Sequence, residues 1–129
     1  MQHILKESRD LFGKLPPIVI HCFTGKRAEA EAYIDAGFYI GITGFVVMED
    51  RGRRLRGFIK DVVPLENLLL ETDSPFMGFG DTDVRIKGFV KPNEPCTLPV
   101  IAATIAELYD VDVETVARIT TKNASNSWF

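Results

Sequence analysis

Two short segments place a histidine and an aspartate just after apolar runs of the sequence. His21 follows residues 18–20 directly, and Asp73 comes three positions after residues 68–70. Short apolar runs of this kind predict buried strands, and ligands and metals bind at the carboxyl ends of strands in α/β proteins. We therefore expect an imidazole and a carboxylate on one face of the protein, which is half of a metal site.

The chemistry of these two side chains suits hydrolysis. Asp73 offers a hard carboxylate oxygen for Mg²⁺ or a similar ion, or a base for an attacking water. Taken alone, a strand-end carboxylate that caps the next turn explains Asp73 equally well. His21 suits a divalent transition metal or a contact to phosphate, and its alternative is a half-buried histidine with satisfied hydrogen bonds.

Three neighbouring residues add to this set. Glu71 lies two positions before Asp73, so strand alternation puts it on the same face but deeper, either orienting ligands or forming a paired buried carboxylate. Thr43 and Gly44 end another apolar run, where a hydroxyl and close backbone approach would meet a substrate. A glycine needed only for the turn is the alternative.

Basic and aromatic side chains suggest contacts to nucleic acid. The basic cluster consists of Arg51, Arg53, Arg54 and Arg56. Arg51 and Arg53 open a predicted helix near the same face and would position phosphates, whereas a solvated helix face better explains the other two. Three phenylalanines in the segment 74–95 either stack on bases or cover the core: Phe76, Phe79 and Phe89.

Length and composition limit the remaining choices. The 129 residues are 46% hydrophobic and 26% charged, with a net charge of -3, which is typical of one soluble domain. A closed (β/α)8 barrel uses about 250 residues, roughly twice this length. Neither Cys22 nor Cys96 belongs to a C-x-x-C pair, so we expect reduced thiols in the cytoplasm. No apolar run is long enough to span a bilayer and no signal-peptide pattern is present, so no membrane partner is expected.

The periodicity predicts alternating strands and helices. Strands are expected at residues 18–20, 38–42 and 67–70. Helices are expected at residues 2–12, 26–36 (closed by Gly37), 51–62 (capped by Asp50), 97–109 (capped by Thr97) and 112–122 (capped by Asp112). This order favours an α/β fold with parallel strands joined by right-handed crossover helices. The pattern alone does not separate a small open sheet from one side of a barrel.

Four motifs, taken in order and spacing, resemble the C-terminal half of the TatD family of metal-dependent deoxyribonucleases. They are Ile-His-Cys-Phe-Thr-Gly at residues 20–25, Tyr-Ile-Gly-Ile-Thr-Gly at 39–44, Leu-Glu-Thr-Asp-Ser-Pro at 70–75 and Asn-Glu-Pro at 93–95. The similarity runs from about residue 1 to residue 122. It implies that the three strands are strands six to eight of a TIM (β/α)8 barrel of the metal-dependent hydrolase type.

The resemblance also implies roles for individual residues. His21 matches the metal-ligand histidine of strand six, and Asp73 matches the aspartate that ends strand eight and acts as ligand and catalytic residue. Around them we expect substrate contacts from Thr43, Arg51 and Arg53, and supporting roles for Glu71, Asn93 and Glu94, the last pairing with a cation to hold the long loop. The implied cofactor is a divalent cation, Mg²⁺ first, with Mn²⁺ or Zn²⁺ as alternatives. The implied substrate is DNA, and the implied location is cytoplasmic, or nuclear in a eukaryote.

Other parts of the family pattern have no counterpart in these residues. The His-x-His pair of the first strand, the bridging glutamate and the strand-five histidine would all precede Met1, and His3 has no His-x-His partner. We therefore expect residues 1–129 to be a single partial TatD-like domain whose activity is uncertain from sequence. Two alternatives stay open: an inactive remnant or interaction module, and an amidohydrolase-type hydrolase that is not a nuclease. Because three strands leave two open sheet edges, we also expect self-association, most simply as a dimer.

Overall fold

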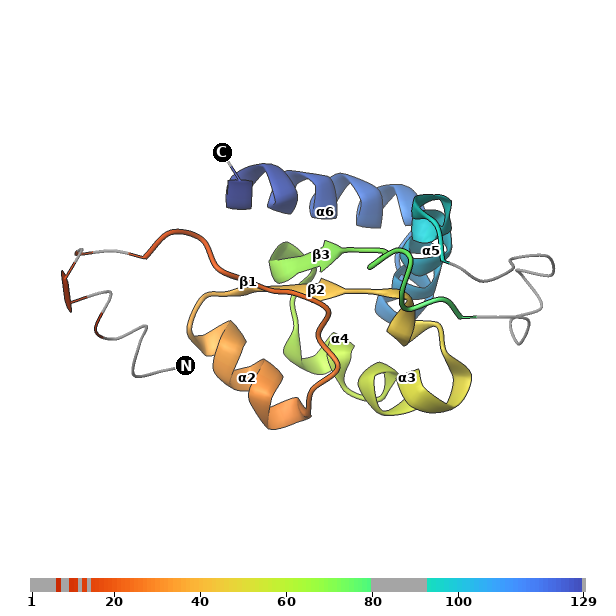
Figure 1. Cartoon of the computed structure of the whole chain (residues 1–129), viewed down its shortest axis with the longest axis horizontal. Helices are drawn as coiled ribbons and strands as arrows, with labels where there is room; N and C mark the ends of the chain where they lie inside the picture. The colour runs from red at the N-terminus through yellow and green to blue at the C-terminus, as the bar shows by residue number, and fades with distance from the viewer. Residues whose placement is uncertain (1–6, 8–9, 12, 14, 80–92, 129) are drawn as a thin grey trace.

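A parallel sheet of three strands forms the centre of the protein (Figure 1). The computed structural model describes residues 7, 10, 11, 13, 15–79 and 93–128. The strands are β1 (Val19–Ile20), β2 (Tyr39–Ile42) and β3 (Leu68–Leu70), in the spatial order β1-β2-β3. Both pairings are parallel: Val19 lies opposite Tyr39, and Ile40 lies opposite Leu68. The predicted α/β fold with parallel strands and crossover helices is therefore confirmed.

Helices cover the sheet on both faces. They are α2 (Arg27–Asp35), α3 (Glu49–Arg56), α4 (Ile59–Val62), α5 (Leu98–Tyr109) and α6 (Val113–Trp128), with short 3-10 turns at Gly44–Val46, Leu65–Asn67 and Pro95–Thr97. Figure 1 shows α2, α3 and α4 on one side of the sheet and α6 on the other. No helix in the described part of the chain is long and apolar enough to cross a lipid bilayer.

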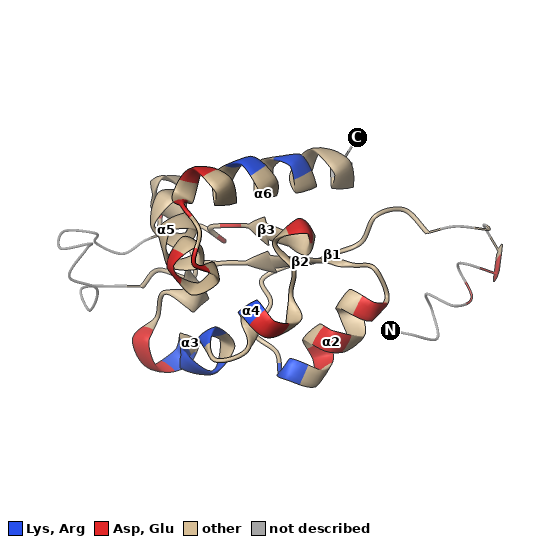
Figure 2. Cartoon of the chain, turned by 180° about the vertical axis from the view of Figure 1, so that it is seen from behind, with Lys and Arg blue, Asp and Glu red and all other residues tan. Residues whose placement is uncertain are grey.

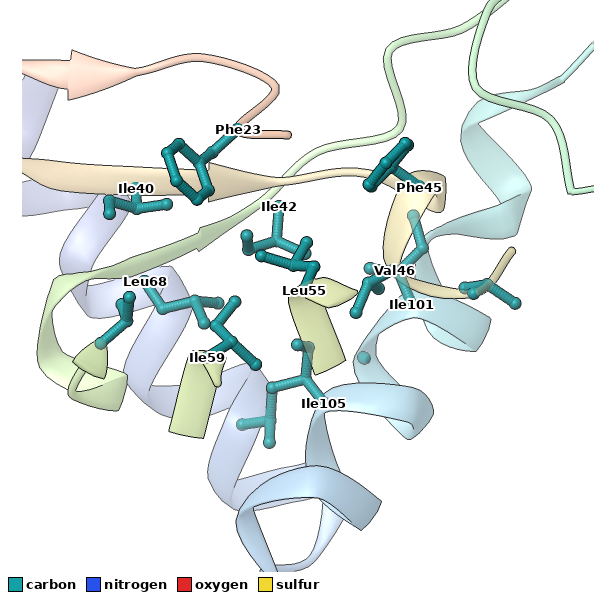
Figure 3. Packing of buried hydrophobic residues seen from close by; sticks show 14 of the residues in the cluster. Phe23, Ile40, Ile42, Phe45, Val46, Leu55, Ile59, Leu68, Ile101 and Ile105 are labelled. Atoms are coloured by element: carbon teal, nitrogen blue, oxygen red, sulfur yellow. The ribbon is translucent and has the colours of Figure 1, made fainter. Parts of the chain in front are cut away.

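The core explains why the strands read as continuous apolar runs. Ile40 and Leu68 are fully buried within the sheet, and Ile59 of α4 and Ile105 of α5 are equally inaccessible. Figure 3 shows these side chains converging between the strands and the two helices. Strands covered on both faces need apolar side chains in both directions, which removes the alternation typical of half-exposed strands.

The three predicted strands and two of the five predicted helices, at residues 26–36 and 97–109, lie within one or two residues of the observed elements. Gly37 follows α2 with a φ of 78°, as expected for a glycine that ends a helix. Asp112 caps α6, since its Oδ1 accepts a hydrogen bond from the Thr115 amide at 2.6 Å. Thr97 occupies the cap position of α5 but makes no capping hydrogen bond with its side chain. Most of the helix predicted at residues 2–12 lies outside the described residues.

The single helix predicted over residues 51–62 is wrong. The chain forms α3 and α4 instead, with a break at Gly57 and Phe58. Glycine has a low helix propensity, and Phe58 leaves helical geometry with a φ of -140° while burying its ring to 7% exposure. The predicted cap is also wrong, because Met48 holds the N-cap position and Asp50 lies in the first turn.

The last helix is longer than predicted, because it continues past residue 122 to Trp128. Asn123, the first residue after the predicted helix, lies inside the observed one and is only 4% exposed. Its side-chain amide donates hydrogen bonds to the carbonyl oxygens of Leu65 at 2.7 Å and Leu68 at 2.8 Å. Asn123 therefore ties α6 to the start of β3.

Replacing Asn123 with alanine should lower the free energy of unfolding by about 1–3 kcal/mol, because two buried carbonyl groups lose their partner. Urea denaturation of the purified chain measures this change. Asn126→Ala is the matched control, since Asn126 lies on the same helix but is exposed, and it should change stability by less than about 0.5 kcal/mol. Equal stability of the two variants would contradict the structural role of Asn123.

Candidate metal centre

The site forms where the carboxyl ends of β1 and β3 reach the same edge of the sheet. His21 directly follows β1, and Glu71 directly follows β3. The His21 Nδ1 atom lies 2.6 Å from Glu71 Oε2, and its Nε2 atom lies 3.2 Å from Asp73 Oδ1. The structure therefore brings the imidazole and the carboxylates together across β2, as the strand-end positions suggested.

Glu71 reaches over the central strand to make these contacts. Its Oε2 also accepts a hydrogen bond from the Cys22 backbone amide at 3.1 Å. The carboxylate lies directly over Gly41 of β2, where any Cβ atom would collide with Glu71 Oε1. A glycine inside a strand often marks such a close approach, and Gly41 is needed here to make room for the carboxylate.

Glu71 was expected to lie deeper than Asp73, but the two side chains are covered to a similar extent, with 19% and 23% exposed. The strand alternation stops before Asp73, whose φ of 57° is left-handed. Cys22 has a similar φ of 48°. Left-handed backbone costs a non-glycine residue about 1–3 kcal/mol and is concentrated at functional sites.

Each of the two ring nitrogens of His21 faces a carboxylate oxygen. A neutral imidazole carries one N–H group, and the 2.6 Å contact assigns that proton to Nδ1, facing Glu71. The lone pair of Nε2 then faces the Asp73 carboxylate at 3.2 Å, so two acceptors confront each other. A second proton on the ring, or a cation bound by both atoms, would remove this conflict.

The geometry fits a bound cation. Adjacent ligands of an octahedral ion at ~2.1 Å lie about 3.0 Å apart, close to the Nε2–Oδ1 separation of 3.2 Å. A carboxylate on the far nitrogen of a ligand histidine is the usual way to fix its tautomer, and Glu71 occupies that place. Within the described residues, however, no three His, Cys, Asp or Glu side chains are grouped to hold a metal ion.

Cys22, the residue after His21, contacts Thr43 at the end of β2. The Cys22 Sγ atom lies 3.6 Å from Thr43 Oγ1. Burial raises the pKa of the Cys22 thiol, and the nearby Asp73 and Glu71 charges raise it further, against the Thr43 hydrogen bond that lowers it. The thiol is therefore neutral at pH 7 and a poor nucleophile. Thr43 is only 1% exposed, so its substrate contact stays a prediction.

Asn93 holds the chain on both sides of Asp73. Its side-chain amide donates to the carbonyl oxygens of Thr72 at 2.7 Å and Phe76 at 2.6 Å, and its Oδ1 accepts from the Thr97 hydroxyl at 2.8 Å. Asn93 is 6% exposed, so these hydrogen bonds are shielded from water. They fix the ends of the loop that carries Asp73.

Glu94, the next residue, is exposed. Its contact in the described part of the chain is with the Cys96 thiol at 3.6 Å, rather than with the expected cation.

The four arginines of α3, which appear blue in Figure 2, have different partners in the structure. Arg53 pairs with Asp50 at 2.9 Å, and Arg54 donates to the Thr24 carbonyl at 3.2 Å. Arg56 is not on a solvated face as expected, because it donates to the carbonyls of Val46, Met48 and Glu49. Arg51 lies over the Phe45 ring, with its guanidinium carbon 5.5 Å from the ring centre.

Parallel strands with crossover helices, and site residues gathered at the carboxyl ends of the strands, are features of α/β-barrel enzymes. The model of the TatD related DNase family matches residues 1–128. The chain therefore belongs to this family, as its motifs indicated.

Curated relatives support the same assignment. The 3'-5' ssDNA/RNA exonuclease TatD of Pectobacterium parmentieri is 44% identical over 112 residues, which cover 87% of this chain and 42% of that protein. The protein of the same name from Edwardsiella piscicida is 41% identical over 116 residues, covering 90% and 44%. The chain thus spans less than half the length of the curated relatives it matches.

Solved structures confirm the fold. A TatD family hydrolase from Entamoeba histolytica superposes with a TM-score of 0.76 at 22% identity, covering 98% of this chain and 46% of that one. YJJV, a TatD homologue from Escherichia coli K12, gives a TM-score of 0.69 at 29% identity, covering 84% and 39%. The three strands and their helices therefore correspond to part of a TIM barrel.

Replacing Gly41 with alanine should lower the free energy of unfolding by about 1–3 kcal/mol, because the new methyl group overlaps the Glu71 carboxylate. Urea denaturation measures this, and the His21 ring signals in an NMR spectrum should shift as Glu71 is displaced. Gly57→Ala is the matched control, since its Cβ would meet nothing closer than the Arg54 carbonyl at 3.4 Å. A Gly41→Ala variant as stable as Gly57→Ala, with unmoved His21 signals, would contradict the close approach.

Proposed function

We propose that this chain supplies part of the active site of a metal-dependent nuclease that hydrolyses phosphodiester bonds in single-stranded nucleic acid. The observation that carries the proposal is the convergence of His21, Glu71 and Asp73 at one edge of the sheet. The names of the relatives, which specify single-stranded DNA and RNA, support the substrate class. They extend the DNA substrate expected from the sequence to RNA.

The proposed cation is held by His21 Nε2 and Asp73 Oδ1, with further ligands from groups outside the described residues. Mg²⁺ is the first candidate because Asp73 is a hard oxygen donor, and the imidazole of His21 equally admits Mn²⁺ or Zn²⁺. When bound, such a cation lowers the pKa of its water and polarises the scissile phosphate.

The residues of this chain have distinct roles in the proposal. Asp73 accepts a hydrogen bond from the attacking water and takes up its proton as general base. Glu71 holds the proton on His21 Nδ1, so that Nε2 keeps its lone pair directed at the reaction site. Asn93 keeps the Asp73 loop in position through its hydrogen bonds to Thr72 and Phe76.

An inactive binding module is the second candidate function, and one observation favours it. The described residues contain no group of three potential metal ligands, and an open hard-cation site normally recruits more donors than two. Such a module would act through its sheet, since β1 and β3 each pair on one side only among the described strands. Self-association through these edges is part of this proposal. For either function we propose a cytoplasmic location, or a nuclear one in a eukaryote, consistent with free thiols at Cys22 and Cys96.

Asp73→Asn should reduce metal-dependent release of nucleotides from a single-stranded oligonucleotide by at least about 100-fold, because the amide keeps the shape of the side chain but cannot accept a proton. Nuclease assays with added Mg²⁺ or Mn²⁺, and with a chelator, measure the effect, and thermal melting checks that the variant is folded. Asp35→Asn is the control, since Asp35 is exposed on α2, and it should keep full turnover. Undiminished turnover in Asp73→Asn would contradict the assignment, and metal-independent cleavage would contradict the proposed role of the cation. Absent cleavage by the unmodified chain would favour the binding module.

A further inference from the structure

A hollow of about 670 Å³ opens at the turn that follows Asp73. It is lined by Met48 and Arg51 on one side, by residues 75–78 on another, and by Asn93. The Phe76 amide donates to the Asp73 carbonyl at 2.7 Å, so the hollow begins within one turn of the proposed catalytic carboxylate. Its volume lies in the range of roughly 300–1,000 Å³ that is typical of small-molecule sites. The hollow therefore has room for one nucleotide.

The charge available in this hollow comes from Arg51. The other three arginines of α3 have their guanidinium groups engaged with an acidic side chain or with backbone carbonyls. Arg51 has no hydrogen-bond partner among the described residues and rests on the Phe45 ring. Stacking on a ring fixes the plane of a guanidinium without using its N–H groups. Arg51 therefore presents a full set of donors to a phosphate.

The aromatic surface comes from Phe76. Phe76 is 69% exposed, whereas Phe79 is 6% exposed and packs in the core. Phe89 lies outside the described residues. Of the three phenylalanines considered for base stacking, Phe76 thus offers a free ring face beside the hollow. An exposed aromatic ring stacks on any unpaired base and contributes to the binding of single strands.

The remaining lining residues bear on specificity. The side-chain amide of Asn93 is already used in three hydrogen bonds, so it has little capacity to read a base edge. Met48 and Met77 are flexible and adapt to different shapes. This lining therefore accepts any base and does not select a particular one.

We propose that this hollow binds the nucleotide next to the cleaved phosphodiester, with a phosphate on Arg51 and the base stacked on Phe76. The inference rests on the proposed nuclease function and adds the determinants of its substrate preference. Stacking on Phe76 requires an unpaired base, which selects single strands. The absence of base-reading groups among the described lining residues makes binding independent of sequence.

Binding of fluorescein-labelled oligothymidylate and oligoadenylate to the full chain tests this, with anisotropy measured in a chelator so that no cleavage occurs. Phe76→Ala should weaken binding of both oligonucleotides by about 5- to 150-fold, while Phe76→Trp should restore it. Arg51→Gln should lower the slope of log affinity against log salt by about 0.7, the value for one lost phosphate contact with a single strand. Arg118→Gln is the charge-matched control on α6, across the sheet from α3 (Figure 2), and should leave the slope unchanged.

The inference is overturned if Phe76→Ala binds as tightly as the unmodified chain, if Arg51→Gln behaves like Arg118→Gln, if a duplex binds more tightly than single strands, or if no oligonucleotide binds. These outcomes are separate from the nuclease test. Loss of cleavage in Asp73→Asn, with normal binding by the Arg51 and Phe76 variants, would remove the inference and keep the function. The expected binding pattern without metal-dependent cleavage would remove the nuclease function and leave the hollow as a binding site for single strands.

Discussion

The site depends on one interaction, the contact of the Glu71 carboxylate with the His21 ring across the central strand. Glu71 belongs to the end of β3 and His21 to the end of β1, so the carboxylate joins two strands that do not pair with each other. The same oxygen accepts the Cys22 amide, which holds the turn after β1. Without Gly41 beneath it, the carboxylate has no room to cross. One side chain therefore contacts the histidine ring and the turn that carries it.

The parallel order of the strands makes this contact available. The crossover connections place β1 and β3 on either side of β2 with their carboxyl ends at one edge, so residues about 50 positions apart in sequence meet there. Asn93 also fixes the loop after β3, through partly buried hydrogen bonds on both sides of Asp73. The functional groups lie on segments that are each held at two points, which limits how far they move relative to one another.

Much of the fold could be predicted because it follows from local patterns. The apolar runs gave the strands, and Gly37 and Asp112 marked helix ends through backbone geometry and capping that operate within a few residues. The helix break at Gly57 and the extension of α6 past Asn123 could not be predicted, because both depend on packing with distant segments. Burial of Phe58 decides the first, and hydrogen bonds to Leu65 and Leu68 decide the second.

The candidate site was likewise predictable in part, where it depends on local patterns, and unpredictable where it depends on contacts between distant segments. Residue types at strand ends predicted that His21 and Asp73 would meet, but not that Glu71 would lie at the depth of Asp73, which depends on a left-handed residue. The glycine at residue 41, inside a strand, indicated that some group approaches the backbone closely there. The sequence alone did not identify this group as the Glu71 carboxylate. The sequence grouped Arg51 with Arg53 as candidate phosphate contacts, and only their partners in space distinguish the two.

The central claim is that Glu71 fixes His21 with its proton on Nδ1 and leaves Nε2 for a cation shared with Asp73. Long-range proton–nitrogen NMR of the imidazole, with and without added Mg²⁺ or Zn²⁺, tests this most directly, with His3→Gln used to assign the signals. The account predicts a protonated Nδ1 in the cation-bound state and a change confined to Nε2 as the cation is added. A proton on Nε2, or no response of His21 to any divalent cation, would contradict it.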